Sequence, residues 1–103
     1  MYDIENLAKL KRLADLAPEA FKGFAALDEA AFKGEAVPLK HKELTAVAVA
    51  LATQCPYCIE VHAARARAAG ASEQELAETI LVTAALRAGG AVTHGTHTLA
   101  RAE

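Results

Sequence analysis

The chain lacks tryptophan and has few of the side chains that build β-sheets. Its 103 residues include five aromatic residues and nine Val and Ile residues. Strands favour β-branched and aromatic side chains, so this scarcity argues against a sheet protein. An excess of basic residues is also missing, because the net charge is −2 and the pI is about 6.1. This balance argues against a nucleic-acid-binding protein, which usually presents a basic face.

A long uncharged run is absent as well. The longest stretch without charged residues, residues 44–59, is interrupted by Pro56. It is also shorter than the roughly 20 residues that a membrane span requires. No charged segment followed by an apolar stretch and a cleavage site opens the chain. We therefore expect a cytoplasmic protein without a membrane span.

Alanine is what the chain has in abundance, with 26 residues, and 53% of all residues are hydrophobic. Because Ala has the highest helix propensity, the sequence predicts an all-α fold, and the length fits one domain over residues 1–103. Prolines at first-turn positions, a Ser72–Glu75 capping box and the Gly89–Gly90 pair divide the chain into a bundle of about six helices. The expected helices lie near residues 4–16, 18–32, 38–53, 56–70 (with Gly70 as the stop), 73–88 and 92–101.

The third of these helices is apolar on nearly every side after Glu43. A helix without a polar face must be buried all round, and one domain of this size can scarcely bury it alone. We therefore expect part of its surface to lie in a subunit interface, which predicts a homo-oligomer. The alternative is close packing of Ala-rich helices in a monomer.

The two cysteines form a Cys55-Pro56-Tyr57-Cys58 motif at the expected N-terminus of the fourth helix. Free amide groups and the helix dipole stabilise an anion there, so one of the two thiols should have a lowered pKa. A structural disulfide across this short loop would contribute only about 2 kcal/mol, and the cytoplasm would keep it reduced. A redox-active dithiol is the better interpretation.

His62 and Glu43 are the candidate proton carriers. His62 follows Cys58 by four residues, which places both on one face of a helix. If the third and fourth helices form an antiparallel hairpin, Glu43 lies about one helical turn from His62, within reach of its side chain or one water. The helix dipole favours Cys55 as the nucleophile, whereas the spacing to His62 favours Cys58. The residues alone leave that choice open, and Glu43 could equally be a solvated residue beside Lys40 and Lys42.

Glu43, eleven further residues, Cys55-x-x-Cys58, three further residues and His62 together resemble the motif of the alkylhydroperoxidase D-like proteins. These belong to the carboxymuconolactone decarboxylase superfamily, and the similarity extends over about residues 38–95. The resemblance implies an all-α subunit that assembles into trimers or hexamers. It also implies a peroxidase rather than a decarboxylase, since the decarboxylase branch is not built around this cysteine pair.

In the chemistry that the resemblance implies, Cys58 attacks the hydroperoxide and becomes a sulfenic acid, and Cys55 condenses with it to a disulfide. Glu43, His62 and a water would form the proton relay. An external dithiol would restore the pair, and no cofactor is expected. Family members often have a His where this chain has Tyr57, a further candidate for the relay but a poorer base.

Three other functions remain open from the sequence. The dithiol could exchange disulfides without a peroxide substrate. Cys55, Cys58 and His62 could bind zinc with His94 or His97 as a fourth ligand, although the spacing is not that of a zinc finger. The chain could also be a non-catalytic oligomeric module with two unreactive thiols.

Overall fold

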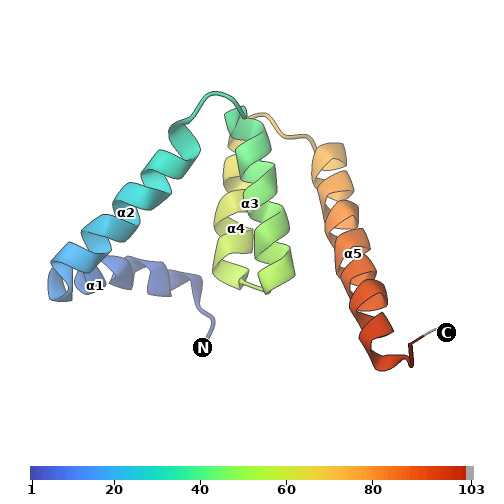
Figure 1. The fold of residues 1–103 in the computed structure, drawn as a ribbon. Helices are drawn as coiled ribbons and strands as arrows, with labels where there is room; N and C mark the ends of the chain where they lie inside the picture. Colours follow the sequence, from blue (N-terminus) through green and yellow to red (C-terminus); the bar gives the residue numbers. More distant parts are fainter. Residues whose placement is uncertain (102–103) are drawn as a thin grey trace.

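The structure is a computed structural model that describes residues 1–101. Within this range helices are the only regular secondary structure, and there is no strand (Figure 1). The expected all-α fold is therefore confirmed. The elements in chain order are the 3-10 helix η1 (Ile4–Lys9), α1 (Leu10–Leu16), α2 (Pro18–Lys33), α3 (Leu39–Thr53), α4 (Pro56–Ala68), α5 (Glu73–Gly95) and the 3-10 helix η2 (Thr96–Thr98).

The helix boundaries agree with the predicted ones except near the C-terminus. The first expected helix begins as η1 and continues as α1. The predicted break at Gly89–Gly90 is wrong, because α5 runs unbroken through both glycines to Gly95. Two glycines cost the helix only about 1 kcal/mol each, and the alanine-rich sequence around them favours helix. Most of the fifth and sixth expected helices therefore forms a single helix, α5.

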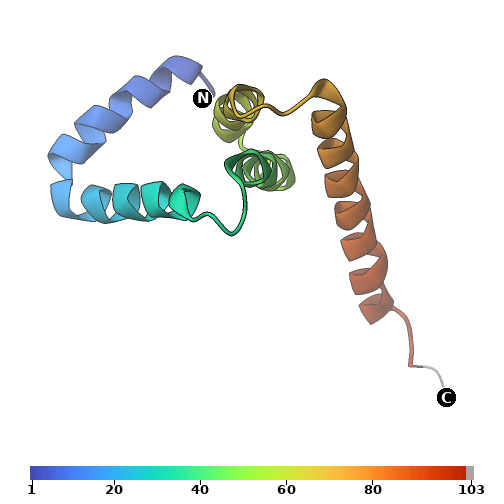
Figure 2. The ribbon, with the colours of Figure 1, turned by 90° about the horizontal axis from the view of Figure 1, so that it is seen from above.

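A hairpin of α3 and α4 forms the centre of the molecule (Figures 1 and 2). Gln54 ends α3 in the left-handed conformation, with φ of 56°, and the Cys55 N–H donates to the Ala50 carbonyl at 3.0 Å. This is the hydrogen bond of a Schellman motif, which satisfies a free carbonyl at the helix end. Pro56 then starts α4. The chain thus reverses within two residues, as the antiparallel arrangement assumed from the sequence requires.

The core between these helices is small and made of small side chains. Ala66 of α4 is fully buried and packs with Val47 of α3, Ala71 and Leu76. Alanine at the contact lets the two helix backbones approach closely. Among residues 1–101, the core residues come from the hairpin, the α4–α5 connection and the first turns of α5.

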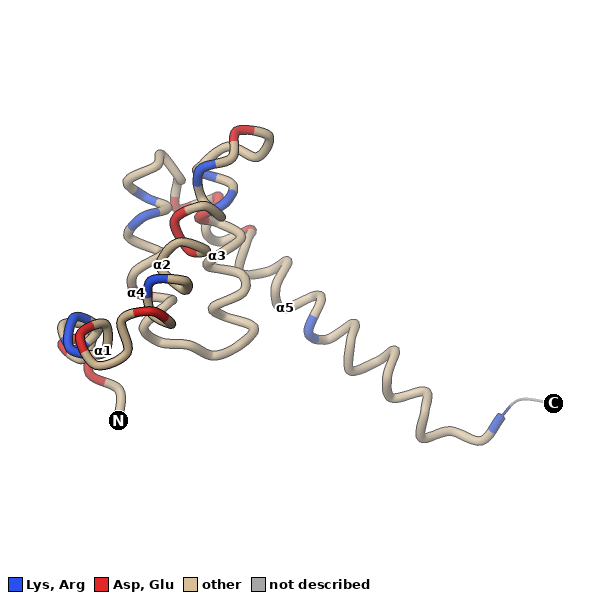
Figure 3. Tube along the Cα trace, turned by 60° about the vertical axis from the view of Figure 1, so that its left-hand side comes forward, with Lys and Arg blue, Asp and Glu red and all other residues tan. Residues whose placement is uncertain are grey.

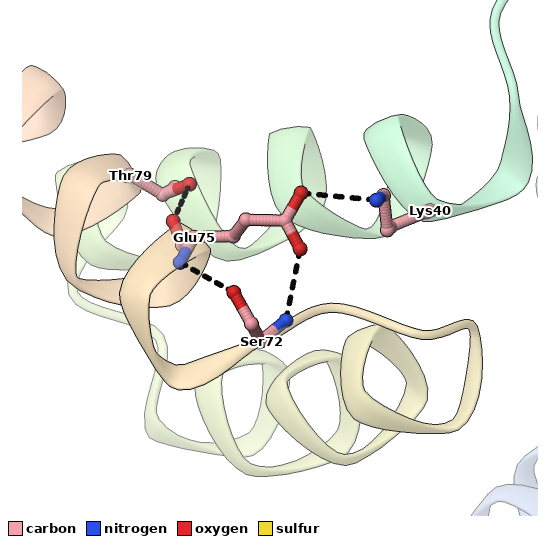
Figure 4. Close-up of polar contacts among 4 residues, drawn as sticks. All are labelled: Lys40, Ser72, Glu75 and Thr79. Atoms are coloured by element: carbon pink, nitrogen blue, oxygen red, sulfur yellow. Dashed lines mark hydrogen bonds and ion pairs between the residues drawn. The ribbon is translucent and has the colours of Figure 1, made fainter.

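The start of α5 is fixed to α3 by a polar contact (Figure 4). Ser72 and Glu75 form the predicted capping box: the Ser72 side chain accepts from the Glu75 N–H at 3.0 Å, and the Glu75 carboxylate accepts from the Ser72 N–H at 2.9 Å. The second carboxylate oxygen of Glu75 pairs with Lys40 of α3 at 3.0 Å. One side chain therefore caps α5 and joins it to the hairpin.

Away from this contact, α2 and α5 diverge from the hairpin on opposite sides (Figures 1 and 2). The radius of gyration is 17.7 Å, against about 13 Å for a compact chain of 100 residues. The accessible surface is 8028 Å², against about 5,500 Å² for a compact monomer of this mass. The isolated chain therefore exposes surface that a folded protein normally buries.

Much of that surface is apolar and lies on α5. After Glu78 this helix carries only one charged residue, Arg87 (Figure 3). Leu81, Leu86 and Val92 are 68%, 71% and 74% exposed. By length and composition alone, residues 73–98 could cross a membrane, a stretch that the sequence analysis did not single out. An apolar helix of this kind also suits contact with another subunit.

The contact of Glu75 predicts a pH dependence of stability. The Ser72 amide and Lys40 hold the pKa of Glu75 below its ordinary value of 4.5. The ionised form stabilises the fold, so this contribution is present above pH 4.5 and is lost as the pH falls toward the lowered value. Urea unfolding at a series of pH values from 7 to 2.5 should show a Glu75→Gln variant less stable than the parent at pH 7, with a difference that shrinks steadily as the pH falls below 4.5. Gln keeps the capping box, so a difference that stays constant over this range would contradict this role of the charge.

Candidate active site

Cys55 and Cys58 lie at the N-terminal end of α4, as the sequence predicted. Cys55 is the N-cap residue, with an extended backbone, and Pro56 takes the first helical position. The Cys58 backbone N–H donates a hydrogen bond to Cys55 Sγ at 3.3 Å. Both thiols are free and partly exposed. One sulfur therefore accepts from the free amides at the helix start, where an anion is stabilised.

The two thiols differ in acidity. Hydrogen bonds from the Cys58 thiol and then from the backbone amides of Cys58 and Tyr57 lower the pKa of the Cys55 thiol. The contact with Cys55, followed by burial, raises the pKa of the Cys58 thiol. The single lowered pKa expected at this motif is thus found at Cys55. Cys58 is the thiol that lies one helical turn before His62.

Glu43 and His62 are brought together by the hairpin. His62 Nδ1 lies 2.9 Å from Glu43 Oε2. Glu43 is only 3% exposed, so of the two possibilities left open by the sequence the buried one is found. An ionised carboxylate can only accept, which places the proton of a neutral imidazole on Nδ1 and leaves Nε2 as the basic nitrogen. The pair can therefore fix the histidine tautomer and stabilise the imidazolium form.

The alternative of a solvated Glu43 beside two lysines is not what the structure shows. Lys40 pairs with Glu75, and Lys42 donates to the Gly34 carbonyl at 2.6 Å. Both lysines are therefore bonded elsewhere, and the carboxylate of Glu43 has the imidazole of His62 as its partner.

Phe32 of α2 covers one face of the imidazole. Its ring is nearly parallel to that of His62, with an interplanar angle of 8° and centroids 5.7 Å apart. Phe32 and Glu43 also border a groove of about 530 Å³ between α2 and the hairpin, together with Leu39 and Arg65. The sequence indicated Phe32 only as an apolar residue of its helix. Its place at the site depends on how α2 folds back, which no local motif reveals.

Tyr57, the third relay candidate, faces another part of the chain. Its hydroxyl accepts from Asn6 Nδ2 at 3.0 Å and from the Asp3 N–H at 3.3 Å, and it donates to the Met1 carbonyl at 3.3 Å. All three partners belong to the N-terminal segment. The structure therefore brings Glu43 to His62 but does not bring the Tyr57 hydroxyl to that pair.

His94 and His97 lie at the far end of α5, where their rings are 5.6 Å apart. Figure 1 shows this end of α5 directed away from the hairpin. Within residues 1–101, no group of three or more His, Cys, Asp or Glu side chains is placed to hold a metal ion. The structure thus does not assemble the zinc ligands considered from the sequence.

The model of the carboxymuconolactone decarboxylase family matches residues 18–100 of this chain. The chain belongs to the carboxymuconolactone decarboxylase family. A relative from Paracoccus denitrificans, described as uncharacterized protein 4 in the cox locus, is 46% identical over 77 residues, which cover 75% of this chain and 69% of that protein.

A solved structure gives the same result for the fold. The crystal structure of an apo carboxymuconolactone decarboxylase family protein from Legionella pneumophila superposes with a TM-score of 0.75 at 35% identity. The match covers 80% of this chain and 73% of that one. The resemblance noted from the Glu–Cys–Cys–His spacing is therefore confirmed at the level of the family. The part matched by the family model holds all the site candidates, whereas the N-terminal segment that contacts Tyr57 lies before it.

The asymmetry of the two thiols predicts unequal reactivity toward iodoacetamide. At pH 7 we expect Cys55 to be alkylated faster than Cys58, because a larger fraction of Cys55 is the reactive thiolate. The difference should shrink as the pH rises toward 10. Fragment-ion mass spectrometry of the peptide that holds both cysteines measures the two sites separately. Urea-unfolded protein is the control, and equal rates in the folded protein would contradict the assignment.

Proposed function

We propose that this family member is a thiol-dependent peroxidase that reduces hydroperoxides through a dithiol–disulfide cycle of Cys55 and Cys58. The observation that carries the proposal is the partly buried hydrogen bond between Glu43 and His62, with His62 one helical turn beyond Cys58. A cysteine pair that only bridged the chain would have no use for a buried carboxylate–imidazole pair. A thiol that must be deprotonated, and a leaving group that must be protonated, would use both.

In this cycle His62 Nε2 takes the Cys58 proton, directly or through a water, while Glu43 stabilises the imidazolium. The Cys58 thiolate attacks the terminal oxygen of the hydroperoxide, the O–O bond breaks, and Cys58 becomes a sulfenic acid. The alcohol leaves with the proton that His62 returns. Cys55 then attacks the Cys58 sulfur, and the S–S bond forms as water leaves.

An external dithiol completes the cycle by supplying two electrons and two protons to the disulfide. The sulfurs hold both electrons between the steps, so the cycle requires no cofactor. The cytoplasm, where dithiol reductants keep thiols reduced, is the compartment we propose. The substrates are thus a hydroperoxide and a dithiol, with no nucleic acid or membrane involved.

A second candidate is disulfide exchange without peroxide, and the lowered pKa of Cys55 favours it. In that reaction the Cys55 thiolate attacks a disulfide of another molecule and forms a mixed disulfide. Cys58 then displaces the second thiol and leaves Cys55–Cys58 oxidised. The two candidates therefore assign the first attack to different sulfurs.

Single-cysteine variants separate the two functions. For the peroxidase, Cys58→Ser should lower hydrogen peroxide consumption by roughly a hundredfold or more, because it removes the nucleophile. Cys55→Ser should accumulate a sulfenic acid on Cys58 that dimedone labels. Stopped-flow kinetics and mass spectrometry measure both effects. For disulfide exchange, Cys58→Ser should still form a mixed disulfide with an aromatic disulfide probe, while no variant reacts with peroxide.

Glu43→Gln tests the relay separately. Gln can still accept a hydrogen bond from His62 but carries no charge to stabilise the imidazolium, so peroxide turnover should fall roughly ten- to hundredfold. Circular dichroism should show an intact fold. Full turnover in Glu43→Gln would exclude Glu43 from the proton transfer.

Turnover of Cys55→Ser at the parental rate with a dithiol donor would contradict the resolving role of Cys55.

We further propose that the functional form is a homo-oligomer, a trimer or a hexamer. The chain exposes about 2,500 Å² more than a compact monomer of its mass, by comparison of 8028 Å² with about 5,500 Å². A standard interface buries about 800 Å² on each partner. The excess therefore suits more than one interface for each chain, as a ring of subunits provides.

A charged residue on the apolar side of α5 should disrupt this assembly. Leu86→Glu places a carboxylate where the side chain is 71% exposed in one chain and would be buried between chains. We expect light scattering after gel filtration to give a trimeric or hexameric mass for the parent and a smaller mass for the variant. Gln74→Glu, at the polar start of α5, is the matched control. A parent that stays monomeric in detergent-free buffer would contradict the proposal.

A further inference from the structure

The first six residues lie across the first turn of α4, next to the two cysteines. We call residues Met1–Asn6 the N-terminal strap. The Tyr2 ring packs against the Tyr57 ring, with centroids 4.8 Å apart and an angle of 57°. The Tyr2 hydroxyl is hydrogen-bonded to Glu60 of the same turn, and this contact raises the pKa of Tyr2 to about 12. Tyr2 therefore stays a neutral donor over the whole range in which thiols titrate.

The hydroxyl of Tyr57 forms three hydrogen bonds with the strap. It uses its proton for the Met1 carbonyl and accepts from both Asn6 Nδ2 and the Asp3 N–H. Asn6 Nδ2 also donates to the Met1 carbonyl at 3.1 Å. A tyrosine hydroxyl has one donor and two acceptor sites, so this group is fully bonded. The hydrogen bonds from the strap to α4 go to Tyr57 and to Glu60.

Tyr57 is also part of the surroundings of the Cys55 sulfur. Cys55 Sγ accepts from the Cys58 N–H, and the neighbouring amide of Tyr57 also stabilises its ionised form. The side chain of Tyr57 is thus fixed by the strap, while its backbone belongs to the turn that supports the sulfur. Contacts that restrain the Tyr57 side chain therefore act on the residue whose backbone belongs to this turn.

We propose that the N-terminal strap positions Tyr57 and thereby holds the first turn of α4 in the geometry in which Cys55 is the N-cap and its Sγ accepts from the Cys58 N–H. Tyr2, Asn6 and Tyr57 are positioning residues, since none of them touches a reacting atom. Release of the strap should make Cys55 less reactive. Its consequence for a catalytic cycle rests on the proposed function, but its test does not.

The strap should also shift the redox equilibrium of the pair. Reduction of the disulfide adds two electrons and breaks the S–S bond, and each sulfur that is not left ionised takes up one proton. A strap that keeps Cys55 Sγ against the amides of the helix start stabilises the ionised form of this sulfur and hence the reduced pair, as in other dithiols whose reduced state is stabilised. Weakening the strap should therefore favour the disulfide in equilibrium with dithiothreitol.

Two full-length variants test the inference. Tyr57→Phe keeps the ring and removes the three hydroxyl contacts, and Asn6→Ala keeps both tyrosines and removes one anchor. In both we expect iodoacetamide to alkylate Cys55 roughly three- to tenfold more slowly at pH 7, with an unchanged rate at pH 10. The dithiothreitol equilibrium should move toward the disulfide by a similar factor. Glu5→Gln, in the strap but outside its contacts with Tyr57, is the matched control.

Detachment of the strap is measured independently of the thiols. Hydrogen exchange at the η1 amides should become faster in both variants. In Asn6→Ala the near-ultraviolet tyrosine signal should also change, because Tyr2 and Tyr57 are the only tyrosines in a chain without tryptophan. Faster exchange with an alkylation profile identical to the parent would overturn the proposal. Unchanged exchange in both variants would overturn it too, because these bonds would then not hold the strap.

None of these measurements needs a peroxide. If the protein consumes no hydroperoxide but the variants shift alkylation and the dithiothreitol equilibrium, the peroxidase proposal fails and the strap proposal stands. If the protein consumes hydroperoxide normally but the variants change neither the alkylation rate nor the dithiothreitol equilibrium, the strap proposal fails and the peroxidase proposal stands.

Discussion

The hydrogen bond between Glu43 and His62 is the interaction on which the site depends, and it exists only because α3 and α4 run antiparallel. Burying a carboxylate without a partner costs several kcal/mol, so the hairpin must deliver the imidazole to Glu43 in order to fold well. The left-handed turn at Gln54 and the helix start at Pro56 set the offset between the two helices. The same two residues flank Cys55, so one turn places the Glu43–His62 pair and the two cysteines on the same hairpin.

The distribution of buried residues separates a compact centre from two open arms. The hairpin and the start of α5 share one small core, which the Lys40–Glu75–Ser72 contact closes at one end. The helices α1 and α2 on one side, and most of α5 on the other, present apolar surface that one chain does not cover. The candidate active site lies on the compact centre, where the geometry of a proton relay can be kept, while the arms offer surface for assembly.

The two sulfurs of the motif are not equivalent, although they are three residues apart. The Cys55 sulfur accepts hydrogen bonds from the amides at the start of α4. Cys58 donates a hydrogen bond to Cys55 and lies one helical turn before His62. A peroxide reaction and a disulfide exchange would use this asymmetry in opposite order. The choice between them therefore depends on which sulfur is ionised when the substrate arrives. The amides of the helix start favour Cys55, whereas a proton acceptor at His62 would favour Cys58. The contacts of Tyr57 with the N-terminal strap connect a segment outside the family match to this same turn.

Sequence patterns alone predict the helical class, most helix boundaries, the capping box at Ser72, the dithiol at a helix start and the family, because each depends on spacing within a few dozen residues. Local patterns also suggested a helix break at Gly89–Gly90, which flanking alanines and continuous hydrogen bonding overrode. The packing of helices in three dimensions is what buries Glu43 against His62, stacks Phe32 on the imidazole and turns Tyr57 toward the N-terminal strap. These contacts join residues 19 to 56 positions apart, and their geometry is fixed by how whole helices pack, which no local pattern encodes.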